Sequence, residues 1–575
     1  MKQINSSGKI ILFWIPLLLF INCARVASPP GGPKDETPPE IQKSSPQNYS
    51  VNFTDKVIDI SFDEYIRFDN INQLIVSPPM KTKPDIKMKG KGIQIKMDDT
   101  LTKNTTYTLN FGNSIVDNNE SNPIENFQFV FSTGPNLDSL NLSGVVMNAY
   151  DLEVPKDVYI LLYDNLADSA IYIEKPLYLT KANEKGNFFL SNLKVGKFNV
   201  FALQDEDQNY IYNPPENIAF LDTILVLRPE THGDSVIISD SIQISSPKYK
   251  LKLFEEKLPN QYIISTTRHR KDNILLVFNE ALSEKPMFSL PGRPDLTNWY
   301  IEESFTVGDS IGIWLNDTSL INQESIDLSI KFPLSGADKG KYLTDTTSFR
   351  FTKPKSKSRK TSKPAVQAES KLILTFSLGA GNRMELNRNL LCLSQTPINS
   401  YDENRIAIFA IKDSIETEVD FKLIFSRTRI RNIYFNIDWK EDTDYRIELL
   451  PDAITDMYHT INDSLKYSFK TRKLDYYGTL EFEMEEINEN IIIQLLDEKQ
   501  QVVKSTLISN DTTLTYQFLP PKTYRIKAIL DENKNGKWDT GSWLKKQQPE
   551  KVKYYFEEIK LRSNWEFKKT WSPDF

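Results

Sequence analysis

Short runs of alternating apolar and polar residues recur along almost the whole chain, and this pattern constrains the fold more than any other feature. Clear cases are 57–62, 107–111 and 127–131. Successive side chains of a strand point to opposite faces, so such runs predict strands with one buried face. Because the runs are short and are separated by Asn, Asp, Gly and Pro, they predict β-sandwich modules. We therefore expect an all-β fold of tandem sandwiches with no long helix.

Two kinds of internal repeat support a modular chain. The first kind, A, has an alternating run around a phenylalanine, and its copies begin at 60–64, 276–280 and 374–377. The second kind, B, has an aromatic strand that runs into an acidic loop, and 193–205 aligns without gaps on 519–531. The predicted order of modules is therefore A-B-A-A-B.

These repeats and the breaks between them divide the chain of 575 residues. We predict Ig-like sandwiches at 37–134, 246–353 and 369–473, and sandwiches of the second kind at 138–245 and 474–575. Residues 354–368 are rich in Lys and poor in apolar residues, which predicts a flexible basic linker. Contact of this linker with an acidic surface polymer is the alternative.

The first 22 residues predict a secretion signal. Lys2 and Lys9 precede an apolar run at 10–21, which is too short to cross a hydrocarbon core of about 30 Å. The run therefore indicates a signal peptide over 1–22 rather than a membrane span. It ends at Cys23 in a segment that resembles a bacterial lipobox. The resemblance implies that Cys23 is acylated and becomes the mature N-terminus; secretion with an incidental cysteine is the alternative.

Residues 23–36 contain several Pro and Gly residues and predict a tether. At its end, Lys34, Asp35 and Glu36 resemble the lysine-acidic-acidic signal that sends Bacteroidota lipoproteins to the cell surface. A solvated charge cluster is the alternative interpretation.

The first module carries a family resemblance. Its segments 62–64, 104–107, 115–117 and 129–133 resemble the bacterial Ig-like domain of the S-layer-protein type. Residues 23–133 together resemble the Ig-like-domain lipoproteins common in Bacteroidota. The second kind of module is similar to the transthyretin-like or carboxypeptidase-regulatory-like sandwich. These resemblances imply a lipid-anchored protein of the outer membrane, on the cell surface, and they imply no defined activity.

Composition argues against several classes of function. The net charge is −7, from 70 basic and 77 acidic residues, so the chain lacks the electrostatic pattern of a nucleic-acid-binding protein. His232, His269 and His459 lie far apart in the sequence, which argues against a histidine triad or a His-rich zinc centre. With two cysteines, a disulfide framework is not expected, and Cys392 lies among leucines and is predicted to be buried.

The final module contains a candidate calcium loop. Asp531, Asn533, Asn535 and Asp539 stand at the first, third, fifth and ninth positions of a D-x-N-x-N-G pattern, in which Gly536 permits a sharp turn. Position twelve is a serine instead of the usual glutamate, so modest affinity is expected. An ordinary Asx-rich turn is the alternative.

A sister loop follows the equivalent strand of the earlier module. It contains Asp205, Asp207, Asn209 and Asn213. Tyr210 replaces the glycine, and we expect this to oppose the same turn. The sequence therefore favours calcium in the final module over calcium here.

Three functions remain open. The leading hypothesis is a non-catalytic scaffold that binds other envelope proteins and serves as an accessory of an export or assembly machine. The second is a surface glycan-binding module that uses C-terminal aromatics such as Trp538 and Trp543. The third is an unrecognised hydrolase; Asp63 and Glu64 are the weak acidic pair considered for it.

Overall fold

Strands make up nearly all the regular structure of the described residues. The structure, a computed structural model, describes residues 35–71, 74–229, 249–257, 261–305, 308–334, 340–352, 371–378 and 381–575. The α-helices within these ranges are the single-turn α1 (Ala170–Ile173) and α2 (Thr318–Ile321). No helix in this part of the chain has the length and apolar character needed to span a membrane. The predicted all-β fold of tandem sandwiches is confirmed.

Several predicted features lie outside the described residues. They are the signal peptide at 1–22, the lipidation residue Cys23, most of the tether with Lys34, and the basic linker at 354–368.

The first module is a sandwich of two main sheets. One sheet has the order β1 (Ile41–Ser45), β2 (Val57–Phe62), β6 (Gly92–Lys96), β5 (Asp85–Lys89), and the other has the order β4 (Ile75–Ser77), β7 (Thr106–Gly112), β9 (Phe127–Ser132). A small pair joins β3 (Ile66–Phe68) to β8 (Ile115–Asp117). Ile58, Ile60 and Phe62 alternate with exposed residues along β2, and all three are buried in the core between the sheets.

The third and fourth modules have the same two-layer plan. In the third, β18 (Ile263–Arg270), β19 (Asn273–Phe278), β22 (Ser310–Leu315) and β21 (Tyr300–Ser304) face β20 (Met287–Ser289), β23 (Ser325–Pro333) and β24 (Tyr342–Arg350). In the fourth, one sheet has the order β25 (Leu374–Ser377), β27 (Leu390–Ser394), β32 (Asn432–Asn436), β31 (Lys422–Phe425). The other has the order β26 (Arg383–Met384), β35 (Leu465–Thr471), β33 (Asp444–Leu449), β29 (Ile406–Lys412), β30 (Ile415–Glu418), and β28 (Ile398–Tyr401) pairs with β34 (Ile454–Asp456).

The second and fifth modules have equivalent strands and share most of their pairings. The second contains β10 (Leu140–Asn148), β11 (Val158–Tyr163), β12 (Tyr178–Lys181), β13 (Asn187–Leu193), β14 (Gly196–Gln204), β15 (Asn217–Phe220), β16 (Leu225–Leu227) and β17 (Tyr249–Glu255). The fifth contains β36 (Gly478–Met484), β37 (Ile491–Leu496), β38 (Val502–Ile508), β39 (Thr512–Leu519), β40 (Thr523–Leu530), β41 (Val552–Tyr554), β42 (Ile559–Lys560) and β43 (Glu566–Trp571). In both, the first strand pairs with the fourth and, in parallel, with the last. The fifth strand pairs with the second, the sixth and the seventh. One pairing differs, because β15 pairs with β17 in the second module and the equivalent strands of the fifth are not paired.

This equivalence corrects one predicted boundary. The sequence placed the end of the second module at 245 and the start of the third at 246. In the structure β17 is the last strand of the second module, because it pairs in parallel with β10 and antiparallel with β15. The break at 245–247 in the sequence thus precedes the closing strand instead of following the module.

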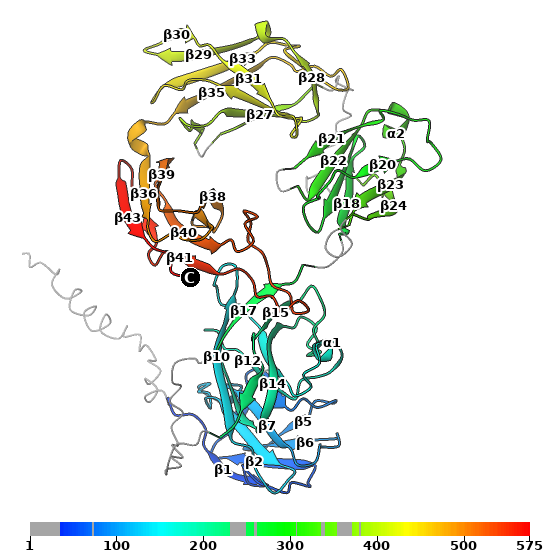
Figure 1. The fold of residues 1–575 in the computed structure, drawn as a ribbon, viewed down its shortest axis with the longest axis vertical. Coiled ribbons are helices and arrows are strands. Elements are labelled where there is room, and N and C mark those ends of the chain that lie inside the picture. The colour runs from blue at the N-terminus through cyan, green and yellow to red at the C-terminus, as the bar shows by residue number, and fades with distance from the viewer. Residues whose placement is uncertain are drawn as a thin grey trace, which may run out of the picture.

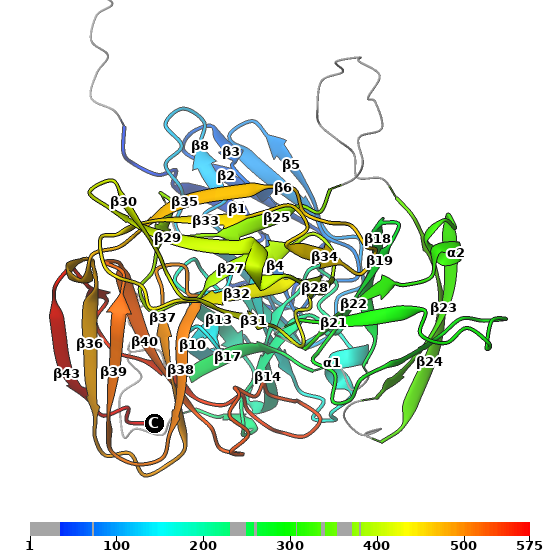
Figure 2. The same ribbon diagram turned by 90° about the horizontal axis from the view of Figure 1, so that it is seen from above.

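The five modules do not form a rod in which each contacts only its neighbours in sequence. Figure 1 shows the chain leaving the second module, passing through the third and fourth, and returning so that the fifth lies against the second. Figure 2 likewise places the strands of the fifth module beside β10 and β17. Leu152 of the second module packs with Ile492, Ile529 and Val552 of the fifth. The tandem modules predicted from the sequence are therefore joined by a long-range contact that the sequence did not indicate.

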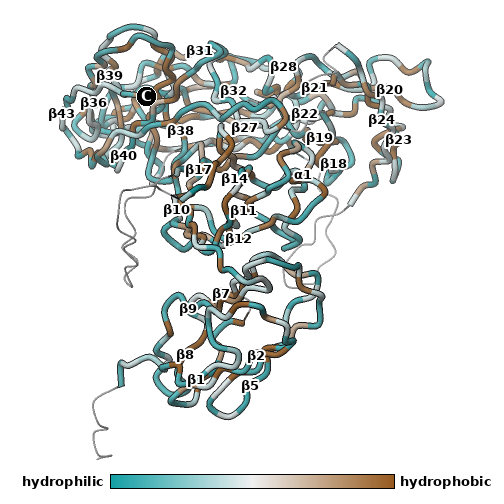
Figure 3. Tube along the Cα trace, turned by 60° about the horizontal axis from the view of Figure 1, so that its bottom comes forward, coloured by the Kyte–Doolittle hydropathy of each residue, from teal (hydrophilic) through white to brown (hydrophobic). Residues whose placement is uncertain are grey.

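The first module attaches at the opposite end of the second. Figure 3 shows it below the other four, with β7 nearest to the second module. Ile75 of β4 packs into a cluster of the second module, and the Leu179 amide donates to Ser77 Oγ at 3.1 Å. The second module therefore contacts the first at one end and the fifth at the other.

Candidate functional site

Two acidic loops occupy equivalent places in the second and fifth modules. The loop after β14 begins at Asp205, and the loop after β40 begins at Asp531. Both aspartates are the first residue after the strand, and both are buried, with 4% and 1% of their surface exposed. The gapless sequence alignment of these segments therefore corresponds to a real structural equivalence.

In the loop of the fifth module, both carboxylate oxygens of Asp531 accept hydrogen bonds from backbone amides. Its Oδ1 accepts a hydrogen bond from the Asn535 amide at 3.0 Å, and its Oδ2 accepts from the Gly536 amide at 2.9 Å. Gly536 has a φ of 73°, in the left-handed region that glycine adopts without strain. These bonds close the predicted turn around one carboxylate.

The other carboxylate of this loop, Asp539, has protein partners. The side-chain amides of Asn533 and Asn535 both donate to Asp539 Oδ2, and Lys257 of the second module lies 3.2 Å from Oδ1. Although burial raises the pKa of Asp539, these hydrogen bonds and the lysine outweigh it and lower the pKa. Calcium on Asp531, Asn533, Asn535 and Asp539 stays a prediction.

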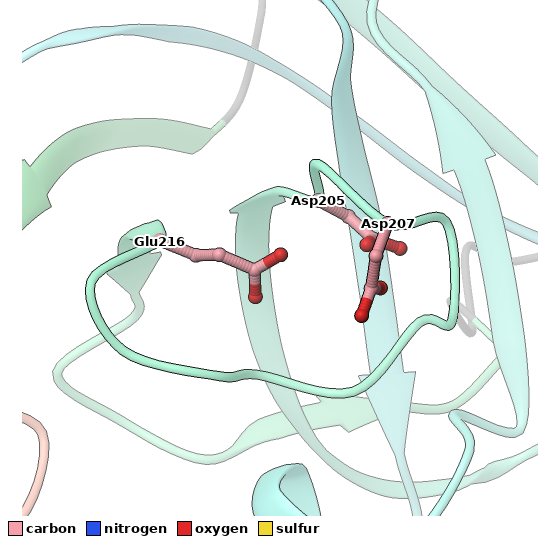
Figure 4. A group of neighbouring side chains, drawn as sticks. All are labelled: Asp205, Asp207 and Glu216. Carbon is pink, nitrogen blue, oxygen red and sulfur yellow. The ribbon is translucent and has the colours of Figure 1, made fainter.

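The sister loop in the second module places three carboxylates close together. Asp205, Asp207 and Glu216 each place a carboxylate oxygen within 4.8 Å of the others, and within the described ranges they are the one such group of three His, Cys, Asp or Glu residues. Figure 4 shows their carboxylates pointing toward one another across the loop. Burial, and then the neighbouring Asp207 side chain, raises the pKa of Asp205, and burial raises the pKa of Glu216.

The expectation that Tyr210 opposes the turn is wrong. Tyr210 has a φ of 63°, close to that of Gly536, so the tyrosine adopts the backbone conformation of the glycine. Its amide donates to Asp205 Oδ2 at 2.8 Å, and its ring meets that of Tyr159 edge-on at 5.3 Å. The ring packing and the hydrogen bond offset the cost of a left-handed non-glycine residue.

Sequence reasoning missed a glutamate in each loop. Glu216 accepts from the amides of Glu206 and Asn213 at 3.0 and 2.9 Å. Glu550 makes the same pair of bonds with Glu532 and Asp539 at 3.0 and 2.9 Å. Counted from Asp205, Glu216 stands at the twelfth position, where a calcium loop has its glutamate. Glu550 was hidden because a longer segment separates it from Asp531.

That longer segment, 540–549, forms the contact between the fifth and second modules. Trp543 is 4% exposed and packs edge-on against Phe201 and Phe220 of the second module, with ring centroids 4.7 and 5.1 Å away. Its indole Nε1 donates to the Asp168 carbonyl at 2.9 Å, and its backbone amide donates to Glu256 Oε1 at 2.6 Å. A tryptophan of the fifth module is thus part of the core of the second.

Neighbouring residues complete this contact. The Thr540 hydroxyl donates to the Glu255 carbonyl at 2.6 Å, and Lys546 pairs with the Asp168 carboxylate at 2.6 Å. A Cβ on Gly541 would lie 2.5 Å from the ring of Phe254, so the close approach requires glycine. We call the whole contact between the second and fifth modules, of which 540–549 with their partners form the first part, the 2–5 interface.

A second part of the 2–5 interface lies along β40. Tyr150 of the second module meets Trp538 edge-on at 5.0 Å, and the Lys527 ammonium lies 3.0 Å from the centre of the Tyr150 ring. Lys527 is 1% exposed. Burial lowers its pKa to about 7, against the opposing effect of Asp151.

Other sequence candidates are spread through the fold. Asp35 and Glu36 are exposed, and the Thr37 amide and hydroxyl donate to the Asp35 carboxylate. Asp63 accepts from the Glu40 amide at 2.8 Å at the end of β2. Cys392 is buried, as predicted, and burial raises the pKa of its thiol to about 12.

Comparison with known proteins supports the Ig-like assignment of the first module. Residues 35–133 match the family model of the bacterial Ig-like domain. No curated protein matches the chain.

Several solved structures have low similarity to the chain. The major pilin subunit BcpA of Bacillus cereus is 10% identical over 76% of this chain and 99% of its own, with a TM-score of 0.14. The S-layer protein SbsC is 10% identical over 91% of this chain and 67% of its own, with a TM-score of 0.13. A structure of native alpha-2-macroglobulin from Escherichia coli that spans domains MG0-NIE-MG1 is 11% identical over 47% of this chain and 94% of its own, with a TM-score of 0.16. At these TM-scores we draw no conclusion about arrangement or function from them.

Proposed function

We propose that the protein is a non-catalytic lipoprotein of the outer membrane that acts as a structural or protein-interaction scaffold, as an accessory of an envelope export or assembly machine. The observation that carries this proposal is the 2–5 interface. It joins modules whose sequences are separated by two other modules, so the second to fifth sandwiches form a closed frame instead of a flexible string, and the first is attached to the second. A frame of this kind holds distant surfaces at fixed positions, as a scaffold requires.

The membrane anchor in this proposal is the acylated Cys23. A signal peptide that is removed leaves the lipid as the anchor, and the tether at 23–36 separates the lipid from the first module. Changing Cys23→Ala should move the protein from membranes to soluble fractions, measured by fractionation and immunoblotting. Retention of the variant in washed outer membranes would show that protein contacts hold it there and would contradict a lipid anchor.

The scaffold function predicts stable partners among envelope proteins. We expect a tagged wild-type protein, solubilised from outer membranes, to co-purify with specific partners at fixed ratios. A Trp543→Ala variant, which opens the frame, should lose them, whereas Trp565→Ala should keep them because Trp565 is half-exposed on the fifth module. Recovery of no stable partner by the wild-type protein would contradict the proposal.

The glycan-binding alternative has less support. Trp543, one of the tryptophans considered for sugar stacking, is buried in the 2–5 interface, and Trp538 packs on Tyr150. The buried Trp543 therefore offers no open face for stacking on a sugar.

A further inference from the structure

The buried carboxylate of Asp205 is only half satisfied by the protein. Its Oδ2 accepts from the Tyr210 amide at 2.8 Å. Its Oδ1 is fully buried and accepts no hydrogen bond from the described residues. A buried, charged acceptor without a partner is destabilising, so this oxygen needs a cation or a proton.

The surroundings of Oδ1 favour a cation. Asp207 and Glu216 bring two further carboxylates, and the three ligand oxygens lie within 4.8 Å of one another. One ion at about 2.3–2.6 Å from each oxygen, the usual range for Ca²⁺, can therefore bridge all three. Without a cation, the carboxylates repel one another in a half-buried place.

The order of residues in the loop matches that of a calcium site. Asp205, Asp207, Asn209, Asn213 and Glu216 stand at positions one, three, five, nine and twelve. Asp205 uses one oxygen to hold the turn and leaves the other for the ion. Each Glu216 oxygen accepts one backbone amide, at 3.0 and 2.9 Å, and retains a lone pair.

We infer that the loop at 205–216 of the second module binds Ca²⁺ through the carboxylates of Asp205, Asp207 and Glu216. The ligands are all oxygen atoms, which suits a hard cation, and an irregular loop can satisfy the variable coordination of Ca²⁺ more readily than the strict octahedron that Mg²⁺ requires. The equivalent loop of the fifth module differs where it matters: Asn533 replaces Asp207, both Asp531 oxygens hold amides, and Lys257 pairs with Asp539.

The calcium loop also contacts the 2–5 interface. Tyr212 belongs to this loop, and its hydroxyl donates to Glu256 Oε2 at 2.9 Å. The other oxygen of Glu256 accepts from the Trp543 amide at 2.6 Å. The ion would therefore stabilise a loop that helps to hold Glu256 against Trp543. This inference concerns metal binding and does not depend on the proposed scaffold function.

The test is calcium titration of the purified full-length protein after removal of metal by a chelator. We expect one saturable site by calorimetry, with a Kd between about 10⁻⁶ and 10⁻³ M, and a melting temperature that rises with calcium more than with equal magnesium. Asp207→Asn copies the residue of the fifth module onto an exposed position, so the fold should persist while affinity falls about tenfold or more. Glu216→Gln should act in the same direction.

The matched control is Asp539→Asn, which removes a carboxylate from the equivalent loop and should leave calcium affinity unchanged. Two results would overturn the inference. One is no binding and no change in melting temperature on adding calcium, which would leave a shared proton on Asp205 as the explanation of its raised pKa. The other is a response that survives Asp207→Asn and Glu216→Gln but disappears in Asp539→Asn, which would place the ion in the fifth module.

Discussion

At the scale of single residues, Trp543 makes both aromatic contacts and hydrogen bonds across the 2–5 interface. It is buried among aromatic rings of a module other than its own. Truncating a buried tryptophan to alanine in a packed core costs about 3–5 kcal/mol. We expect Trp543→Ala to destabilise the interface by roughly this amount, so that the modules separate at lower urea concentration.

The measurement for this prediction is urea denaturation followed by tryptophan fluorescence and circular dichroism. Trp565→Ala is the control, since that side chain is 48% exposed, and it should change stability by less than about 1 kcal/mol. Equal effects of the two substitutions would show that Trp543 has no special role between the modules.

The lowered pKa of Lys527 predicts that the stability of the folded protein depends on pH. Its folded pKa is lowered to about 7, mainly by burial, whereas an exposed lysine has a pKa of about 10.4. Between these values the unfolded chain binds a proton that the folded protein does not, so the stability contributed by this residue rises with pH from about 7 to about 10.4. It falls as pH decreases through this window and stays constant below it.

Lys527→Met removes the titrating group while keeping the length of the side chain. We expect the rise in stability between pH 7 and pH 10 to be smaller in this variant than in the wild-type protein, measured by urea denaturation across the range. The exposed Lys551 on the same module provides the control substitution, Lys551→Met. An unchanged slope in Lys527→Met would mean that Lys527 keeps an ordinary pKa.

At the scale of elements, the sequence predicts strands and repeats better than contacts between them. The alignment of 193–205 with 519–531 predicted the equivalence of β14 and β40, because a strand and its following turn are set by local pattern. β17 was assigned to the wrong module, since it pairs in parallel with β10, a strand about 100 residues earlier.

In the candidate site, too, local features could be predicted from the sequence and tertiary contacts could not. Aspartates and asparagines at alternate positions predicted both loops, but the ranking of the loops depended on Tyr210, whose left-handed backbone is maintained by tertiary packing. The role of Trp543 could not be inferred from its neighbours in sequence, because its partners belong to another module. Local pattern therefore predicted the turn, while burial and partners required the structure.

The segment 540–549 is expected to be needed for the 2–5 interface but not for folding of the fifth module. In the second module, the two residues Pro214 and Pro215 stand at the place that 540–549 occupy in the fifth. The strands on either side pair in the same way in both modules. We therefore expect deletion of 541–548 to leave the fifth module folded while the 2–5 interface is lost. Circular dichroism should retain the strand signal, and cleavage by a protease between modules should become faster. Loss of the strand signal would show that the segment is required for folding of the module itself.

At the scale of the whole molecule, the central claim is that the second to fifth sandwiches form a closed frame, with the first attached to the second. The claim depends on the direct contacts of the fifth module with the second: the packing of Trp543, the cluster around Leu152, and the pairs Lys257–Asp539 and Lys546–Asp168. Exposed ion pairs contribute little on their own, so the apolar contacts should provide most of the closing energy.

Small-angle X-ray scattering of the chain from residue 24, free of lipid, tests closure most directly. We predict that the wild-type protein scatters as the closed arrangement in Figure 1, with one compact distribution of interatomic distances. Trp543→Ala should show a larger radius of gyration and a longer maximum dimension. A wild-type profile that is already extended, and that Trp543→Ala leaves unchanged, would contradict the closed frame.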